Sequence, residues 1–179
     1  MSRALVLSAV LVFLLTSASP TSMLLDEQHI DSVGDADNII ISEILVSPNG
    51  MKNTEECTNC YNATDWNGDG EYGSYSDQFI ELHNPTSQAI NVSNWVLDDK
   101  PDGGSAPCQI ARNTVIPANG YISIFRNASR IELDYFDADS VSLTDTSGSL
   151  IHQISYPAEG IFYGNTYITE EDGSLGSTS

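Results

Sequence analysis

Residues 65–84 read DWNGDGEYGSYSDQFIELHN, and this stretch joins a polar loop to an alternating segment. The alternating part is Phe79–His83. Ile80 and Leu82 point to one side of the chain, and Phe79, Glu81 and His83 point to the other. That pattern predicts a half-buried strand. The polar part offers side-chain oxygens at every second position and then a glycine, as in the front half of a Ca²⁺-binding loop. The stretch therefore predicts a cation loop that leads into a core strand, which is more typical of a stabilised β-module than of a catalyst.

Five residues of this loop are candidate Ca²⁺ ligands. They are Asp65, Asn67, Asp69, Glu71 and Asp77. Alternate residues of a tight loop can converge on one hard cation, and Glu71 would contribute its backbone carbonyl. The position of the bidentate EF-hand glutamate is Ser76, so Asp77 replaces it only if the loop is one residue longer. The alternative is an ordinary turn rich in Asp and Asn. The predicted role of the ion is structural, so its loss would loosen residues 51–77 and leave the sandwich folded.

Short apolar segments follow one another along the chain and are separated by turn signals such as DDKPDGG at 98–104. The predicted strands are Asn38–Val46, Gln78–His83, Ile90–Leu97, Cys108–Ile116, Gly120–Phe125, Ser140–Thr144, Leu150–Tyr156 and Ile161–Ile168. Only the N-terminus carries a convincing helical apolar pattern. Regular short strands of this kind predict an all-β antiparallel sandwich. Trp95 and Tyr121 are predicted as core residues, since large aromatic side chains in strands are mostly buried.

The N-terminus predicts a secreted protein. A short positive start at Arg3 precedes the uncharged, mostly apolar run Ala4–Leu15 and then the small residues 16–18. This pattern predicts a cleaved signal peptide at 1–18, with a retained anchor as the alternative. After cleavage no second apolar stretch is long enough to span a membrane. The expected organisation is an acidic linker at 19–37, a sandwich at 38–168 with a Cys- and Asp-rich insertion at 51–77, and a polar tail at 169–179.

The charge and the cysteines narrow the possible partners. The formal net charge is −19, which repels phosphate backbones and makes nucleic acid an unsuitable partner, whereas divalent cations or a basic partner suit it. The three cysteines, Cys57, Cys60 and Cys108, would tend to pair outside the cell. Either Cys57 and Cys60 pair with each other, or one of them pairs with Cys108. A structural zinc site would need four ligands, and the second pair of Cys or His is missing.

Four aromatic residues in or beside the loop form a candidate ligand platform. They are Tyr61, Trp66, Tyr72 and Tyr75. In a polar insertion a core role for them is not obvious, so they could stack on sugar rings or pack on a protein partner. The alternative is that they fold inward as a small local core over the ion.

Five motifs resemble the lamin-tail domain in its prokaryotic secreted type. The motifs are Ile41–Ile44, Gln78–Pro85, Ile90–Asp98, Ile116–Tyr121 and Ser140–Gly148. They lie in the family's order and cover about residues 38–156. The resemblance implies an immunoglobulin-like β-sandwich that acts as a non-catalytic binding or structural module. The chain lacks the coiled-coil rod of nuclear lamins and carries a secretion signal, so filament formation and chromatin binding are not carried over.

The leading hypothesis is a secreted, non-catalytic interaction or adhesion module with a calcium-stabilised loop, whose partner is a protein or a surface glycan. One alternative is a carbohydrate-binding module that uses the loop aromatics. Another is a small secreted hydrolase built on clustered acids. The histidines His29, His83 and His152 belong to no hydrolytic motif, and the sequence contains no nucleophile elbow, zinc-protease or P-loop pattern. We therefore expect no enzymatic activity and no catalytic residues.

Overall fold

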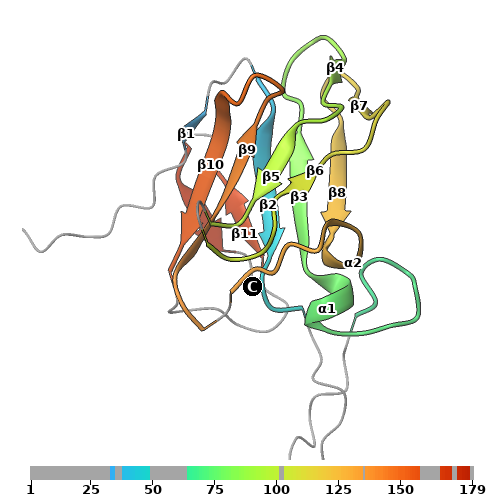
Figure 1. The fold of residues 1–179 in the computed structure, drawn as a ribbon, viewed down its shortest axis with the longest axis vertical. Coiled ribbons are helices and arrows are strands. Elements are labelled where there is room, and N and C mark those ends of the chain that lie inside the picture. The colour runs from blue at the N-terminus through green and yellow to red at the C-terminus, as the bar shows by residue number, and fades with distance from the viewer. Residues whose placement is uncertain are drawn as a thin grey trace, which may run out of the picture.

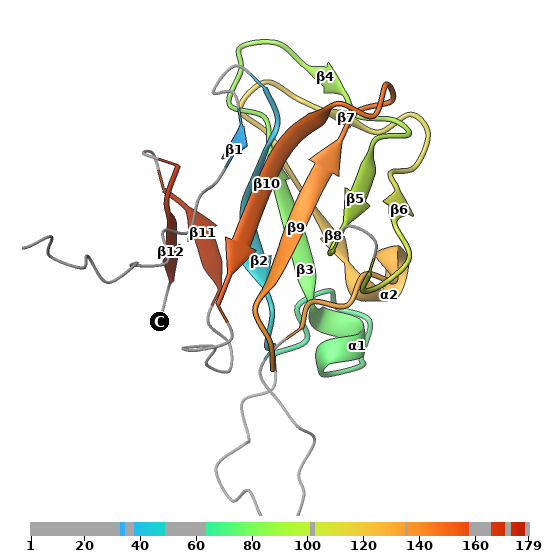
Figure 2. The same cartoon turned by 60° about the vertical axis from the view of Figure 1, so that its left-hand side comes forward.

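Two five-stranded antiparallel sheets pack face to face as a β-sandwich (Figures 1 and 2). The structure is a computed structural model that describes residues 33–34, 38–48, 64–100, 103–134, 136–157, 166–170 and 173–177. The β9 sheet contains, in spatial order, β1 (Val33–Gly34), β10 (Leu150–Tyr156), β9 (Asp139–Thr144), β5 (Val96–Asp98) and β6 (Cys108–Gln109). The β3 sheet contains β12 (Leu175–Ser177), β11 (Tyr167–Thr169), β2 (Ile40–Leu45), β3 (Phe79–His83) and β8 (Tyr121–Phe125). The all-β sandwich predicted from the sequence is confirmed.

The remaining elements are short. β4 (Ile90–Asn91) and β7 (Val115–Ile116) pair with each other at one end of the sandwich. At the other end, helices α1 (Ser74–Asp77) and α2 (Arg126–Ser129) lie next to each other (Figure 1). Among the described residues, no helix is long and apolar enough to cross a membrane.

The core lies between the two sheets and consists mainly of aliphatic side chains. Those with no exposed surface include Ile39, Ile41, Ile44, Leu82, Leu97, Ile116, Val141 and Leu143. The alternation predicted for β3 is confirmed, because Ile80 and Leu82 join this core while Glu81 and His83 are only half-buried. Burial of this apolar surface is the main stabilising contribution to the fold.

Two of the predicted strands are each broken in the middle. The predicted strand Ile90–Leu97 is β4 and β5, and Cys108–Ile116 is β6 and β7. Asn94 and Asn113 lie in the breaks with left-handed backbone angles, φ 63° and φ 64°. Asparagine tolerates this conformation better than other residues that carry a Cβ, so it can turn the chain inside an apolar run. Predicting continuous strands was therefore wrong at these two asparagines.

Strands also occur in the two segments predicted as linker and tail. β1 lies in the stretch 19–37, where it pairs with β10, and β12 lies in the stretch 169–179, where it pairs with β11. Gly173 lies between β11 and β12 with φ 82°. The Asp-Gly pair at 172–173 is the sequence signal for a hairpin at this position, since this pair is typical of hairpin turns.

The two predicted core aromatics differ in the structure. Trp95 is partly buried and packs against the core. Tyr121 is 55% exposed, so its predicted burial is wrong. The alternation of β8 directs Ile122 and Ile124 toward the core, which places Tyr121 on the outer face of the β3 sheet. There its ring stacks on that of His83, with centroids 4.1 Å apart and planes 5° apart.

Candidate functional site

The loop that contains the predicted Ca²⁺ ligands lies beside α1 and α2, at the end of the sandwich where β3 begins (Figure 1). Its described part starts at residue 64 and runs through α1. The backbone N–H of Arg126 at the start of α2 donates to the carbonyl of Gln78, at 2.8 Å. The loop is therefore joined at its C-terminal end to both a core strand and the second helix.

Asp65 organises the first turn of the loop. Its Oδ1 accepts hydrogen bonds from the N–H groups of Gly68 (2.6 Å) and Asp69 (3.1 Å), and its Oδ2 accepts one from Gly70 (2.8 Å). Gly68 and Gly70 have φ values of 74° and 83°, the left-handed region that favours glycine. The backbone therefore wraps around one carboxylate.

Asp69 connects the loop to the two helices. Its Oδ1 accepts the Glu71 N–H at 2.8 Å. Its Oδ2 accepts three side-chain donors, from Asn67 (2.8 Å), Ser76 of α1 (2.8 Å) and Asn127 of α2 (2.9 Å). These bonds stabilise the ionised carboxylate, so they lower the pKa of Asp69, the Glu71 N–H contributing most.

Asp77 connects the two ends of the described loop through hydrogen bonds. It is fully buried, and its two oxygens accept the N–H groups of Trp66 (2.9 Å) and Gly73 (2.7 Å). Burial raises the pKa of Asp77, and the charge of Asp65 raises it further, while the two backbone bonds oppose the shift. Asp77, two residues before β3, thus holds Trp66, which lies 11 residues earlier in the loop, close to the start of that strand.

The donor set of the loop suits a hard cation, but the structure does not bring the predicted ligands to one point. Within the described part of the chain, no three His, Cys, Asp or Glu side chains are grouped closely enough to hold a metal ion. The Asn67 amide donates to Asp69 instead of directing its oxygen to the same place, and that oxygen accepts the Asp69 N–H at 2.9 Å. Glu71 is exposed, and its backbone carbonyl stays a candidate Ca²⁺ ligand.

The aromatic residues of the loop have different environments. Trp66 is 38% exposed and lies against Phe79 of β3, with ring centroids 6.1 Å apart. Tyr72 and Tyr75 are 52% and 59% exposed. The predicted platform member Tyr61 lies outside the described residues. Trp66 therefore covers the end of β3, while the two tyrosines face solvent.

Two arginines lie close to the ring of Tyr75. The guanidinium carbons of Arg126 and Arg130 are each 5.7 Å from the centre of its ring, and the Tyr75 hydroxyl accepts a hydrogen bond from Arg130. Arg126 also forms an ion pair with Glu132, at 2.7 Å. The exposed side chains of Tyr75 and Arg130 thus lie beside the half-buried Arg126, and we call this group the Tyr75 patch (Tyr75, Arg126 and Arg130).

Of the predicted disulfide cysteines, the structure describes one. Cys108 in β6 is half-buried and its thiol is free, so the predicted pairing with Cys57 or Cys60 is not seen. Burial raises the pKa of the Cys108 thiol, which disfavours the reactive thiolate. Cys57 and Cys60 lie outside the described residues.

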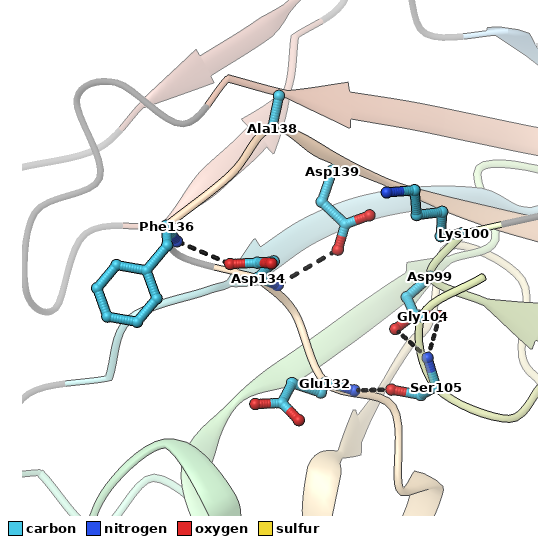
Figure 3. A pocket seen from close by; sticks show the side chains of 9 residues that line it. All are labelled: Asp99, Lys100, Gly104, Ser105, Glu132, Asp134, Phe136, Ala138 and Asp139. Carbon is cyan, nitrogen blue, oxygen red and sulfur yellow. Dashed lines mark hydrogen bonds between the residues drawn. The ribbon is translucent and has the colours of Figure 1, made fainter.

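A second candidate site is an acidic pocket of about 510 Å³ (Figure 3). Its lining is Asp99, Lys100, Gly104, Ser105, Glu132, Asp134, Phe136, Ala138 and Asp139. Asp99 is buried, and both of its oxygens accept the Ser105 N–H, at 3.0 and 2.9 Å. Gly104 has φ 63°, and a Cβ there would lie 2.5 Å from the Asp99 carboxylate, so only glycine fits. The Asp99 carboxylate therefore stabilises a turn and is not free to bind a ligand.

Asp139 is another carboxylate of this pocket that holds structural partners. It accepts hydrogen bonds from the Asp134 N–H and the Tyr156 hydroxyl, each at 3.3 Å. Burial raises the pKa of Asp139, and the nearby charge of Asp99 adds to this. Burial likewise raises the pKa of Tyr156. No local pattern in the sequence indicates this pocket, because acids are abundant throughout the chain and the four acidic lining residues, Asp99, Glu132, Asp134 and Asp139, are spread over 41 residues.

The comparison with known families agrees with the fold. A family model described as Lamin Tail Domain matches residues 32–158, a span that contains β1 to β10, the loop and the acidic pocket. No curated protein gives a significant match. The match covers more than half of the chain and the same region as the five motifs. The chain therefore belongs to the lamin tail domain family.

Proposed function

We propose that this chain is a secreted, non-catalytic adhesion module that binds its partner through the Tyr75 patch, with Ca²⁺ stabilising the loop at residues 64–77. The lamin tail domain family is a non-enzymatic, immunoglobulin-like family, which supports a β-sandwich interaction module. The observation that carries the proposal is Tyr75, which is 59% exposed and has two guanidinium groups within 5.7 Å of the centre of its ring. Tyrosine and arginine are the side chains that protein interfaces favour.

A protein partner fits this surface better than a sugar. A sugar platform needs exposed aromatic rings that lie in one plane, but Trp66 packs on Phe79 and Tyr75 packs against two arginines. The family match also favours a binding role over hydrolysis, and the acids of the pocket in Figure 3 hold backbone turns. We therefore favour the adhesion module over the carbohydrate-binding module and the hydrolase.

The charge of the loop supports the Ca²⁺ part of the proposal. Asp65, Asp69 and Asp77 lie within 13 residues, and the donors that the structure shows on their oxygens are all neutral N–H and O–H groups. The negative charge of Asp65 raises the pKa of Asp77, so these two carboxylates of the loop repel each other. A divalent ion would remove that repulsion, and carboxylate, amide and carbonyl oxygens are the ligands that Ca²⁺ prefers.

We expect the full chain to bind Ca²⁺ saturably in isothermal titration calorimetry. At a Ca²⁺ concentration of 100 times Kd, binding would stabilise the fold by about 2.7 kcal/mol, which appears as a higher Tm with Ca²⁺ than with EDTA. Asp65→Ala and Asp69→Ala should abolish both effects. Asp145→Ala is the matched control, because Asp145 also holds an Asx-type turn, between β9 and β10. An absence of heat, or equal loss in Asp145→Ala, contradicts the calcium proposal.

The adhesion role has its own test, binding of the labelled chain to intact cells of the producing organism. We expect Tyr75→Ser to reduce binding at least fivefold, because it removes the centre of the patch. Leu150→Ser at the start of β10 is the control, since Leu150 is an apolar residue of similar exposure outside the patch. Equal binding by both variants and the unsubstituted chain would exclude the Tyr75 patch as the contact surface.

A further inference from the structure

The open side of β8 is the longest unpaired strand edge of the sandwich in the part of the chain that the structure describes. β8 ends the β3 sheet and pairs only with β3, and no further strand of this sheet lies beyond it (Figure 1). It has five residues, whereas the other three outer strands of the two sheets, β1, β6 and β12, have two or three. Its register with β3 has no bulge. Its sequence, YISIF, contains neither proline nor charge, which are the usual protections of an exposed edge.

The hydrogen bonds at both ends of β8 show which backbone groups face outward. The N–H of Asn84 donates to Gly120 at 2.9 Å, and the N–H of Arg126 donates to Gln78 at 2.8 Å. In an antiparallel ladder these bonds recur at every second residue. Ile122 and Ile124 therefore bond to β3, and the N–H and C=O groups of Tyr121, Ser123 and Phe125 point to the open edge.

An apolar groove of about 420 Å³ lies along this edge, between β8 and β6. Its apolar lining includes Ile110, Ile122, Ile124, Phe125 and Ala128. Ile122 and Ile124 are only half-buried, so their outer surfaces remain available to another apolar side chain. An added strand would place every second side chain into this groove and the others on the outer face of the sheet.

The outer face beside β8 is acidic. Glu81 of β3 lies next to Ser123, whose hydroxyl is 3.5 Å from the Glu81 carboxylate, and Glu43 of β2 is paired with Glu81 across the strands. With a net charge of −19, a second copy of this chain would repel the first at such an edge. A basic strand is complementary to it.

We propose that the edge of β8 binds an extended segment of a partner protein as an additional antiparallel strand. The segment alternates aliphatic residues, which fill the groove between β8 and β6, with lysine or arginine, which face Glu81 on the outer side. Main-chain hydrogen bonds to Tyr121, Ser123 and Phe125 provide affinity, and the groove and the acids provide specificity. This surface adjoins the Tyr75 patch at Arg126, the residue that follows β8, and does not depend on Ca²⁺.

The probe is the acetylated and amidated peptide Lys-Val-Lys-Val-Lys-Val-Lys, titrated with the full chain in EDTA and followed by fluorescence anisotropy. We expect saturable binding, and in amide-resolved hydrogen exchange a slowing of at least tenfold at Ser123 and Phe125. The amides of Ile122 and Ile124 are already bonded to β3 and should change little. Protection at another site, or no binding, overturns the proposal.

Two comparisons separate main-chain pairing from general attraction. The same peptide N-methylated at its lysines, whose N–H groups would face β8, cannot donate to β8 and should bind at least tenfold more weakly. A Glu-Val peptide of the same length should also bind at least tenfold more weakly. Ser123→Pro removes an outward N–H without breaking the ladder to β3 and should also weaken binding at least tenfold, while Ser123→Ala should not. Equal binding in the N-methyl or Glu-Val arm overturns the proposal even if Ser123→Pro fails to fold. A concentration-dependent dimer that Ser123→Pro abolishes would overturn the partner segment in favour of a second copy.

Discussion

Lowering the pH from 6.5 to 4 is expected to remove about 3 kcal/mol of folding free energy through one side chain, His152. His152 lies in β10 with 2% of its surface exposed, and its Nδ1 accepts the N–H of Ile41 in the other sheet, at 3.2 Å. Burial lowers the pKa of His152 from 6.5 to about 4. Protonation would place a charge in the core and remove the acceptor of that hydrogen bond.

The direction of the effect follows from the two pKa values. The unfolded chain takes up the proton near pH 6.5, whereas the folded protein resists it until about pH 4. Between these values the unfolded state binds more protons, so the free energy of unfolding falls as the pH falls. The contribution of His152 is fully present above pH 6.5 and is lost progressively down to pH 4.

Urea unfolding of the full chain and of His152→Gln, at pH values from 7 to 4, measures this effect. Glutamine keeps an acceptor for Ile41 but does not titrate, so the stability advantage of the unsubstituted protein should shrink by about 3 kcal/mol over the range. Asp77 and Asp139 have raised pKa values and act in the opposite direction. They are common to both proteins and cancel in the difference. A difference that does not change with pH would show that His152 is not the responsible group.

Local patterns were sufficient to predict the strands that carry the core. β3, β8 and β10 alternate along one face of a sheet, and each was predicted within one residue of its observed bounds. Period-2 alternation reports burial directly, because each side chain faces either the core or the solvent. The breaks at Asn94 and Asn113 were missed because asparagine in an apolar run does not distinguish a turn from a strand.

The arrangement of the loop depended on residues that the local pattern could not include. The sequence predicted that Asp65, Asn67 and Asp69 lie close together, and they do form one hydrogen-bonded turn. The third donor to Asp69 is Asn127, which is 58 residues away. The Tyr75 patch likewise joins Tyr75 of α1 to Arg126 in α2 and to Arg130, which follows α2. Contacts over such distances follow from the order of strands in the sheet, which residue spacing alone does not determine.

Gln78→Ala is expected to destabilise the fold by about 4 kcal/mol, since it leaves buried backbone groups without partners. Gln78 is 1% exposed. Its Nε2 donates to the carbonyls of Val46 (2.6 Å) and Leu133 (2.7 Å), and its Oε1 accepts the Leu133 N–H (3.1 Å) and Arg126 Nη1 (3.2 Å). One side chain thus joins the end of β2, the segment after α2 and the loop end of β3. Urea unfolding at pH 7 measures the loss.

Gln78→Leu separates the hydrogen bonds from the volume of the side chain. Leucine refills most of the space that alanine leaves, so a loss caused by a cavity would be largely restored. We expect Gln78→Leu to remain about 3 kcal/mol less stable than the unsubstituted protein, because the carbonyls of Val46 and Leu133 stay buried and unpaired. Gln109→Ala, at an exposed glutamine of β6, should change stability by less than about 0.5 kcal/mol. Recovery of stability in Gln78→Leu would mean that packing, rather than the hydrogen bonds of Gln78, holds these three segments together.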